Sequence, residues 1–448
     1  MAVSVTRKDN IRFLPDASRV IARFHNVDNE RSANIIRRVL AMPEMDVNTT
    51  LTQVLRGYSK RHRSISKIFE RHFNKLDHLF TAMHIDPEGL GQSRKLLIGS
   101  YFTKEYSIES AAFFNPSIVE HPDQTELEPE EKRVILSFRA TGEGHISSLV
   151  FRTGVLDSGN NLVLEPIGKM LDEADRIQEI SNNTDSFLAK LGKMKSFDKI
   201  DGDTLLCYEI DFSFDTAISE RVFFPISKVE RNGIEDARFV KFKEDDGEVT
   251  YFATYAAYDG KDVLQRLLET KDFYHFKVSP LLGKVAVNKG MALFPRKING
   301  KYAMLCRIDG ENNYIAFSDN INVWQEATII QEPRYSWEFI QVGNCGAPIE
   351  TEDGWLGITH AVGPMREYVL GANLYDINHP EKLIGRLKTP LLASNEKERE
   401  GYVPNVVYSC GSMVKNGDLI IPYAMSDRAS TYACVNLKEL LNELKNSK

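Results

Sequence analysis

Five copies of one local pattern constrain the fold of this 448-residue chain more than any other feature. Each copy has a small or Pro-containing start, an apolar run rich in Val, Ile, Tyr and Phe, a tight polar turn, and a second apolar run. In three copies the turn contains a dipeptide that favours hairpins: Asn299-Gly300, Asp353-Gly354 and Asn416-Gly417. Such dipeptides indicate hairpins because the central turn residues need positive φ.

The repetition predicts an all-β fold, a five-bladed β-propeller over residues 96–448. Radial repetition of hairpins leaves few exposed strand edges, which is how propellers remain stable. A β-sandwich is the alternative, but it does not explain why every unit begins and ends in the same way. The copies begin near Asn115, Glu235, Ala292, Gly346 and Gly411.

Two stretches differ from this pattern and predict helices. From about Asn29 to Leu79, apolar residues recur at spacings of three and four, so residues 1–95 are expected to form an N-terminal helical extension. This extension is expected to pack on the main domain or on another subunit, which makes a homo-oligomer possible. A second apolar stripe from Pro166 to Leu191 predicts a helical insertion at about 165–195.

Composition excludes several classes of protein. A net charge of −7 gives no general attraction to nucleic acid or to an anionic membrane. No apolar run of about 18 residues predicts a membrane span, and the polar first 15 residues do not resemble a signal peptide. The five widely spaced cysteines favour buried free thiols in a reducing compartment, so we expect a cytoplasmic protein.

In a propeller, equivalent ends of successive repeats meet at the central channel. Carboxylates gathered there among several cations are costly unless the cations bind an anion, so we expect a carboxylic acid beside an anion pocket. The alternative is that each Arg pairs with a nearby Asp or Glu at a blade edge. The residues at these ends are Asn115, Arg139, Glu235, Asp236, Arg238, Lys289, Arg307, His360 and Asp427.

Several motifs in the same order resemble glycoside hydrolase family 130, which contains β-mannoside phosphorylases and a smaller set of β-mannosidases. The resemblance covers roughly Phe114 to the C-terminus and implies a five-bladed propeller. One position departs from the family pattern, because Ala237 stands where the family usually has Pro. The motifs are Phe114-Asn115-Pro116, Ser137-Phe138-Arg139-Ala140, Asn232 to Arg238, Lys289 to Tyr302, Asp353 to His360, Tyr368 to Ala372 and Val403 to Val407.

The resemblance implies that Asp236 donates a proton to the glycosidic oxygen, by way of a sugar hydroxyl. It also implies that phosphate attacks from the opposite face and gives α-mannose 1-phosphate with inversion. No cofactor or metal is expected besides inorganic phosphate as co-substrate. Burial or the neighbouring Glu235 should raise the pKa of Asp236, because the acid must hold a proton near neutral pH. The residues that match the family's phosphate-binding positions are Arg139, Lys289, Arg307 and His360.

The leading hypothesis is therefore phosphorolysis of short β-mannosides, with β-1,2-linked mannose as the substrate. An inverting β-1,2-mannosidase is the first alternative, with Glu143 as the base that activates water. The second is a non-catalytic sugar-binding propeller. The residues expected to contact the sugar are Asn115, Glu235, Arg238, Tyr255 and Asp427.

Overall fold

The computed structural model describes residues 3–168, 170–174, 176–179 and 205–447. The chain divides into two compact units and is mostly β with few helices. The first unit consists of Met1–Pro15, Ala111–Ile167 and Glu173–Lys448, and the second of Asp16–Ser110 and Gly168–Asp172.

The first unit is built from antiparallel meanders. Its largest sheet has 11 strands, in which two meanders, β4-β5-β6 and β11-β12-β13-β14, are joined by a single parallel pair, Gly233 with Ser147. The strands of this sheet are β4 (Ala112–Glu120), β5 (Lys132–Thr141), β6 (Ser147–Leu156), β7 (Leu162–Leu164), β8 (Arg176–Glu179), β9 (Tyr208–Asp211), β10 (Val222–Phe223), β11 (Gly233–Lys243), β12 (Val249–Tyr258), β13 (Val263–Thr270) and β14 (His275–Pro280).

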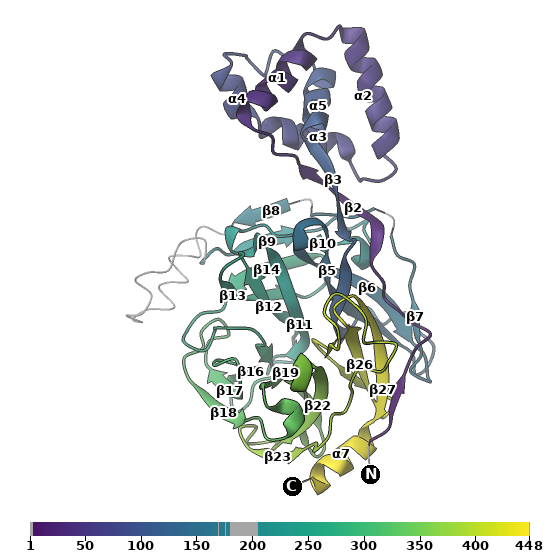
Figure 1. Ribbon diagram of the computed structural model, residues 1–448, viewed down its shortest axis with the longest axis vertical. Helices are drawn as coiled ribbons and strands as arrows, with labels where there is room; N and C mark the ends of the chain where they lie inside the picture. Colours follow the sequence, from purple (N-terminus) through teal and green to yellow (C-terminus); the bar gives the residue numbers. More distant parts are fainter. Residues whose placement is uncertain (1–2, 169, 175, 180–204, 448) are drawn as a thin grey trace. The chain divides into compact units, whose positions relative to one another are not determined.

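Three smaller sheets complete this unit, and Figure 1 shows the sheets following one another in chain order around a common centre. One contains β15 (Ala292–Leu293), β16 (Tyr302–Cys306), β17 (Asn313–Ser318) and β18 (Ala327–Gln331). The next contains β19 (Gln341–Asn344), β20 (Ile349–Thr351), β21 (Gly354–Val362), β22 (Tyr368–Tyr375) and β23 (Leu383–Arg386). The last contains β24 (Val407–Tyr408), β25 (Met413–Lys415), β26 (Asp418–Met425), β27 (Ala429–Asn436) and β1 (Val5–Arg7).

The last sheet joins the two ends of the chain, because β1 pairs with β27 through Val5–Val435 and Thr6–Cys434. Val3 and Val5 also pack against the apolar cluster beneath this sheet. The first residues therefore belong to the β unit, whereas the sequence placed residues 1–95 in one helical extension.

Short helices connect the strands, and α7 (Leu437–Asn446) follows β27. Its apolar side chains Leu440 and Leu444 are fully buried. The 3₁₀ helices are η1 (Glu143–His145), η2 (Ile218–Glu220), η3 (Lys228–Glu230), η4 (Ser336–Glu338) and η5 (Pro364–Arg366).

Two of the three predicted turns adopt the expected backbone, whereas at Asp353-Gly354 only the glycine has a positive φ, of 137°. Asn299 and Gly300 have φ of 51° and 78°, and Asn416 and Gly417 have φ of 49° and 78°. In the second case Lys415 pairs with Asp418 across the turn. Positive φ at both central residues matches the right-handed twist of the flanking strands, so these dipeptides fix the hairpins.

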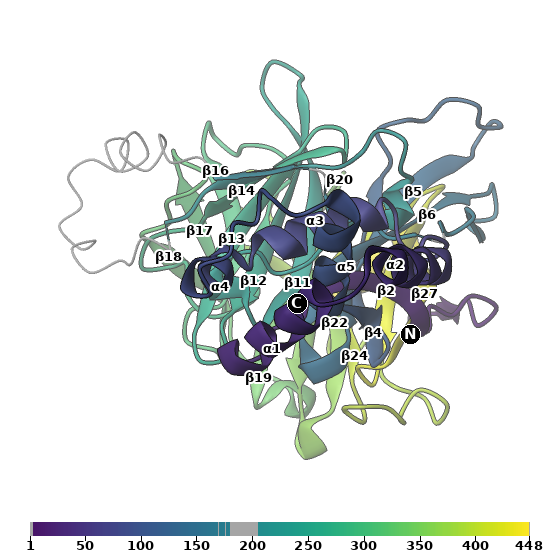
Figure 2. The same ribbon diagram turned by 90° about the horizontal axis from the view of Figure 1, so that it is seen from above.

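The second unit carries five of the six α-helices among the described residues. Helix α5 lies at its centre, where α1, α2 and α3 contact it (Figures 1 and 2). Its strands β2 and β3 form an antiparallel pair, with Asp16 opposite Glu109. The elements are β2 (Asp16–Phe24), α1 (Asn29–Leu40), α2 (Glu44–Tyr58), α3 (Ile65–Asn74), α4 (Asp77–Ala82), α5 (Gln92–Tyr101) and β3 (Thr103–Glu109).

The predicted helix from Pro166 to Leu191 is wrong for its described residues. Residues 170–174 are not helical, and Arg176–Glu179 form β8, which pairs with β9. Four residues that alternate across a strand can mimic one turn of a helical stripe, which explains the error. Residues 180–191 lie outside the described residues. No described helix is both long and apolar enough to span a membrane.

Candidate active site

A pocket of about 180 Å³ in the first unit gathers most of the residues that the sequence singled out. It combines carboxylates with several cations, as expected for a carboxylic acid beside an anion site. The predicted residues among its lining are Asn115, Arg139, Asp236, Lys289, Arg307, His360 and Asp427.

A β-bulge places Asp236. Strand β11 pairs regularly with β12 except between Glu235 and Arg238, where the register shifts. Asp236 takes a φ of 57°, a left-handed conformation that Asp tolerates better than most residues. A bulge bends its strand and redirects a side chain, here into the pocket.

Strand β4 contains an equivalent β-bulge. Its register with β5 shifts between Phe114 and Ser117, and Asn115 has a φ of 50°. The side-chain amide of Asn115 donates a hydrogen bond of 2.7 Å to Oδ1 of Asp236. Two equivalent bulges therefore bring residues 121 positions apart into direct contact.

Glu235 holds two of the cations. It is buried, and Arg139 Nη2 lies 2.5 Å from its Oε1 while Lys289 Nζ bonds its Oε2. Arg139 also donates to Ser147 Oγ at 2.8 Å. Because both carboxylate oxygens are engaged, Glu235 fixes the positions of the cations and does not line the pocket.

Arg238 stabilises the bulge of β11 by a hydrogen bond to its backbone. It is buried, donates to the backbone oxygen of Asp236 at 2.9 Å, and donates to the Tyr408 hydroxyl at 2.8 Å. It is absent from the pocket lining, so a direct contact with sugar, as the sequence predicted, has no support in this geometry.

The pKa of Asp236 differs from the expectation. Burial acts to raise it, but the charges of Arg139, Lys289 and Arg238 and the hydrogen bond from Asn115 lower it to about 2. The predicted rise is therefore wrong. The reason is that Glu235 forms ion pairs with Arg139 and Lys289, and the positive charges of these two residues lower the pKa of Asp236 more than the charge of Glu235 raises it.

Asp427 is the carboxyl group with the opposite shift. Burial raises its pKa to about 6, the nearby Arg139 opposes this, and the charge of Asp236 adds to it. It lies in the turn between β26 and β27 with a φ of 50°. At neutral pH the pocket thus holds one firmly ionised carboxylate and one that titrates close to neutrality.

His360, one of the predicted phosphate-binding residues, is a neutral group at neutral pH. It is buried, and burial together with the charges of Arg307 and Arg238 places its pKa well below the usual value. Its Nδ1 lies 3.1 Å from the backbone oxygen of Asn344, so that nitrogen carries the proton. Nε2 is then an acceptor and lies 3.5 Å from Nη1 of Arg307.

Arg307 and Arg366 are the cations of the pocket that form no ion pair with a described residue. Arg307 is half-buried, and Arg366 is exposed on η5 with a φ of 58°. The N–H groups of a half-buried guanidinium that has no carboxylate partner are available to bind an anionic ligand.

Two predicted residues lie elsewhere. Tyr255 is fully buried, donates to the carboxylate of Glu230 at 2.5 Å, and belongs to an apolar cluster, so it cannot stack on a sugar in this pocket. Glu143 is exposed on η1 and is not among the lining residues.

The sequence did not single out part of the lining. Arg366 follows the turn Gly363-Pro364, a break between two strands that could have marked a loop at the pocket. Tyr408 lies beside Arg238 only in the folded chain, so no local signal points to it. The additional lining residues are Gln341, Arg366, Tyr368, Val403, Val406 and Tyr408. Of these, Tyr368, Val403 and Val406 lie within motifs that carry the family resemblance, but the sequence assigned them no role.

Comparison with known proteins gives consistent matches. Residues 211–446 match the family model described as beta-1,4-mannooligosaccharide phosphorylase. A 1,2-beta-oligomannan phosphorylase from Thermoanaerobacter sp. is 37% identical over 216 residues, which are 47% of this chain and 71% of that protein. A beta-1,2-mannobiose phosphorylase from Listeria innocua is 30% identical over 237 residues, 51% of this chain and 64% of that protein.

A solved structure from the GH130 family of mannoside phosphorylases has a similar fold. That family of mannoside phosphorylases contains glycoside hydrolases that target beta-1,2 mannosidic linkages in Candida mannan. The TM-score is 0.51 at 17% identity, and the match covers 75% of this chain and 87% of that one.

Proposed function

This chain belongs to glycoside hydrolase family 130, and we propose that it is an inverting β-mannoside phosphorylase. Its substrates are short β-1,2-linked manno-oligosaccharides and inorganic phosphate, and its product is α-mannose 1-phosphate. The observation that carries the proposal is the pocket itself, in which Asp236 lies 3.5 Å from Arg139 and shares its surroundings with Lys289 and Arg307.

The cations favour an anionic co-substrate. Arg307 has no carboxylate partner among the described residues, and Glu235 already orients Arg139 and Lys289 before any ligand binds. A phosphate held in this pocket by charge-assisted hydrogen bonds needs no further reorganisation of these side chains. The neutral His360 suits a phosphate that keeps one proton, because Nε2 can accept the P–OH hydrogen bond.

The reaction balances without a further reagent. A phosphate oxygen forms a bond to the anomeric carbon while the bond from that carbon to the glycosidic oxygen breaks. The leaving oxygen receives a proton that originates from Asp236, which Asn115 holds in place at 2.7 Å. Attack opposite the leaving group inverts the anomeric centre.

Hydrolysis is the alternative reaction. It would need a carboxylate base about 6.5–9.5 Å from the acid, with water between them. Glu143, the base suggested for that reaction, is exposed on η1 and outside the lining of the pocket. The cation-rich lining favours phosphate over water as the nucleophile.

The five antiparallel meanders support the finer proposal of a five-bladed propeller. Two of them form the 11-stranded sheet, and the pairing of β1 with β27 would close the ring. The second unit would then be the helical extension, as an appendage or a contact between subunits. The five cysteines are buried free thiols, which supports a reducing, cytoplasmic location.

One experiment tests the proposed reaction. The protein is incubated with β-1,2-mannobiose with and without phosphate, and the products are followed by ³¹P NMR and by chromatography. We expect α-mannose 1-phosphate and mannose in equal amounts, only with phosphate. Release of two mannose molecules at the same rate in phosphate-free buffer would establish hydrolysis instead.

A further inference from the structure

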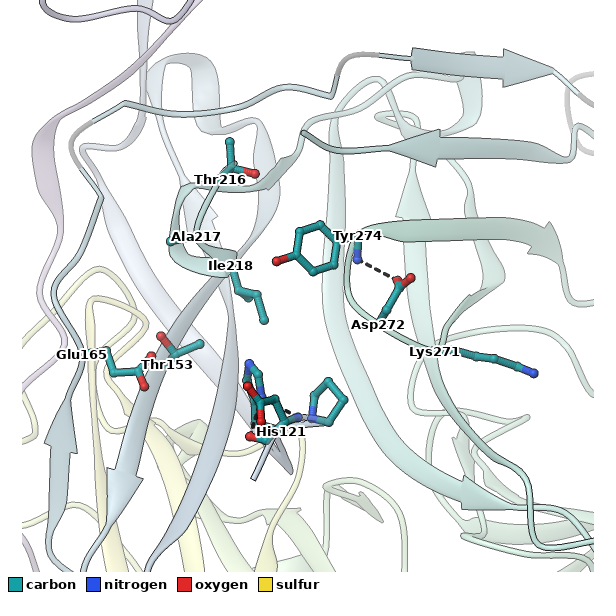
Figure 3. A pocket seen from close by; sticks show the side chains of 11 residues that line it. His121, Thr153, Glu165, Thr216, Ala217, Ile218, Lys271, Asp272 and Tyr274 are labelled. Atoms are coloured by element: carbon teal, nitrogen blue, oxygen red, sulfur yellow. Dashed lines mark hydrogen bonds between the residues drawn. The ribbon is translucent and has the colours of Figure 1, made fainter. Parts of the chain in front are cut away.

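A second hollow in the first unit is larger than the catalytic pocket and shares no residue with it. Its volume is about 620 Å³, within the range of small-ligand sites. Five parts of the chain meet there: the loop after β4, strand β6, the segment after β7, the region around η2, and the turn between β13 and β14 (Figure 3). Its lining consists of His121, Pro122, Asp123, Thr153, Glu165, Thr216, Ala217, Ile218, Lys271, Asp272 and Tyr274.

The hollow is separate from the catalytic pocket along β4. Asn115 of the catalytic pocket lies near the start of this strand, and His121 follows its other end. Six residues of extended chain span about 20 Å. A ligand in the hollow therefore does not contact the catalytic carboxylate.

Tyr274 presents a fixed hydroxyl to the hollow. The guanidinium of Arg221 lies 3.7 Å from its ring centre, and the ring of Phe214 lies 5.2 Å away. Figure 3 shows the hydroxyl directed into the open space, toward the side where Ile218 lies. No described residue forms a hydrogen bond with this hydroxyl, although the backbone amide of Tyr274 donates to Asp272 Oδ1 at 2.8 Å.

The other polar groups also leave hydrogen-bonding atoms available. The Asp123 backbone engages Nδ1 of His121 at 2.9 Å, and Arg133 engages Oε1 of Glu165 at 3.0 Å. Nε2 of His121, Oε2 of Glu165 and the hydroxyl of Thr153 have no hydrogen-bond partner among the described residues. The hollow thus offers acceptors and donors on one surface.

The charges of the lining disfavour a second phosphate. Lys271 is directed away from the open space in Figure 3 and bonds Glu248 at 2.8 Å. The remaining charged lining groups are the carboxylates of Asp123, Glu165 and Asp272, and His121 is kept neutral because burial lowers its pKa. A polyhydroxylated, uncharged ligand satisfies such groups, because its hydroxyls donate to carboxylates while its C–H faces contact side chains such as Ile218.

We propose that this hollow is a secondary saccharide site that binds a manno-oligosaccharide chain away from the catalytic pocket. The inference rests on the proposed function for the identity of the sugar, and on Tyr274, Thr153 and Glu165 for the binding chemistry. Such a site retains longer chains near the enzyme through a second, independent contact, which raises apparent affinity without changing the reaction.

The test measures binding to the full-length protein in phosphate-free buffer with a β-1,2-linked mannohexaose, by calorimetry and saturation-transfer NMR. We expect two sites per chain for the wild type and one for the Tyr274→Phe/Thr153→Val variant. Both substitutions remove a hydroxyl while keeping the shape of the side chain. Tyr101→Phe, which removes a half-exposed hydroxyl in the other unit, is the matched control and should keep two sites.

Kinetics provide the second measurement. The double variant should raise the KM for mannohexaose about fivefold, the effect of one or two lost hydrogen bonds, and leave kcat and the KM for mannobiose unchanged. A single site in the wild type, or two sites in the variant, overturns the inference. Phosphorolysis of mannobiose by the wild type is scored separately, so failure of the secondary site and failure of the proposed function give different results.

Discussion

Binding of a dianion should convert Asp236 from a firmly ionised carboxylate into a usable acid. Arg139, Lys289 and Arg238 outweigh burial and lower its pKa to about 2. Such a group holds almost no proton at neutral pH and cannot donate one. Phosphate bound to the same cations compensates their charge, so the co-substrate itself should restore the proton.

The size of the effect follows from the distances. Arg139 Nη1 lies 3.5 Å from Asp236 Oδ1, which places an anion on the same guanidinium at roughly 6 Å from the carboxylate. At that distance and an effective dielectric constant of about 20, one unit charge contributes about 2.8 kcal/mol, or about two pKa units. A dianion should therefore raise the pKa from about 2 to about 6.

Sulfate is the suitable probe, because it is a dianion that does not itself titrate near neutral pH. Calorimetry of sulfate binding at pH 6 in buffers of different ionisation enthalpy measures linked proton uptake. On binding sulfate, the wild type should take up about half a proton at Asp236, and the total proton uptake of Asp236→Asn should be smaller by that amount. Asp427→Asn serves as the control for the neighbouring carboxyl group. The reasoning is refuted if Asp236→Asn and the wild type take up equal numbers of protons.

Four further predictions concern stability and binding. Asp427 has a pKa raised to about 6, so its favourable contribution to stability is complete below pH 4 and is lost as pH rises through 6. Asp427→Asn should therefore stabilise the protein by about 3 kcal/mol in denaturant titrations at pH 8 and leave stability near pH 4 almost unchanged. Arg307→Ala should raise the KM for phosphate at least about tenfold in initial-rate assays, with the KM for mannobiose unchanged, whereas Arg296→Ala, which removes a guanidinium paired with Glu350, should change neither. Ala237→Pro should raise the free energy of unfolding by about 0.4–1 kcal/mol, as measured by thermal melting. The reason is that the equivalent bulge of β4 already holds Pro116 after Asn115, which has a φ of 50°. A loss of stability would show that the two bulges differ. Replacing Asp16–Ser110 by a short Gly/Ser linker should leave a folded, active β unit, because Asp16 and Glu109 are neighbours in paired strands. A deletion that begins at residue 1 and also removes β1 should destabilise the β unit, because β1 pairs with β27.

The hairpins and the gathering of site residues could be predicted because both depend on short-range signals that repeat. Asn299-Gly300 and Asn416-Gly417 fix their turns through their own φ preferences. Once the repeat is recognised, equivalent positions such as Asn115 and Asp236 are expected to meet, and the structure places them 2.7 Å apart.

Other features depend on partners that lie far away in the sequence. Strand β8 has a helix-like apolar spacing, and only its pairing with β9 makes it a strand. Tyr255 reads as an exposed aromatic of a strand, but it donates to the buried carboxylate of Glu230, 25 residues earlier. Neither partner can be identified from the local pattern.

The charge state of the acid was mispredicted for a related reason. The sequence shows Glu235 next to Asp236, and adjacency alone suggests that one negative charge raises the pKa of the other. In the fold, Glu235 pairs with Arg139 and Lys289, whereas Asp236 accepts a hydrogen bond from Asn115 and lies 3.5 Å from Arg139. The field at Asp236 is then set by Arg238 of the same strand together with Arg139 and Lys289 from distant parts of the sequence, and the protonation of Asp236 depends on what the pocket binds. A phosphorylase gains from this arrangement, because the acid is ready only when the nucleophile is present.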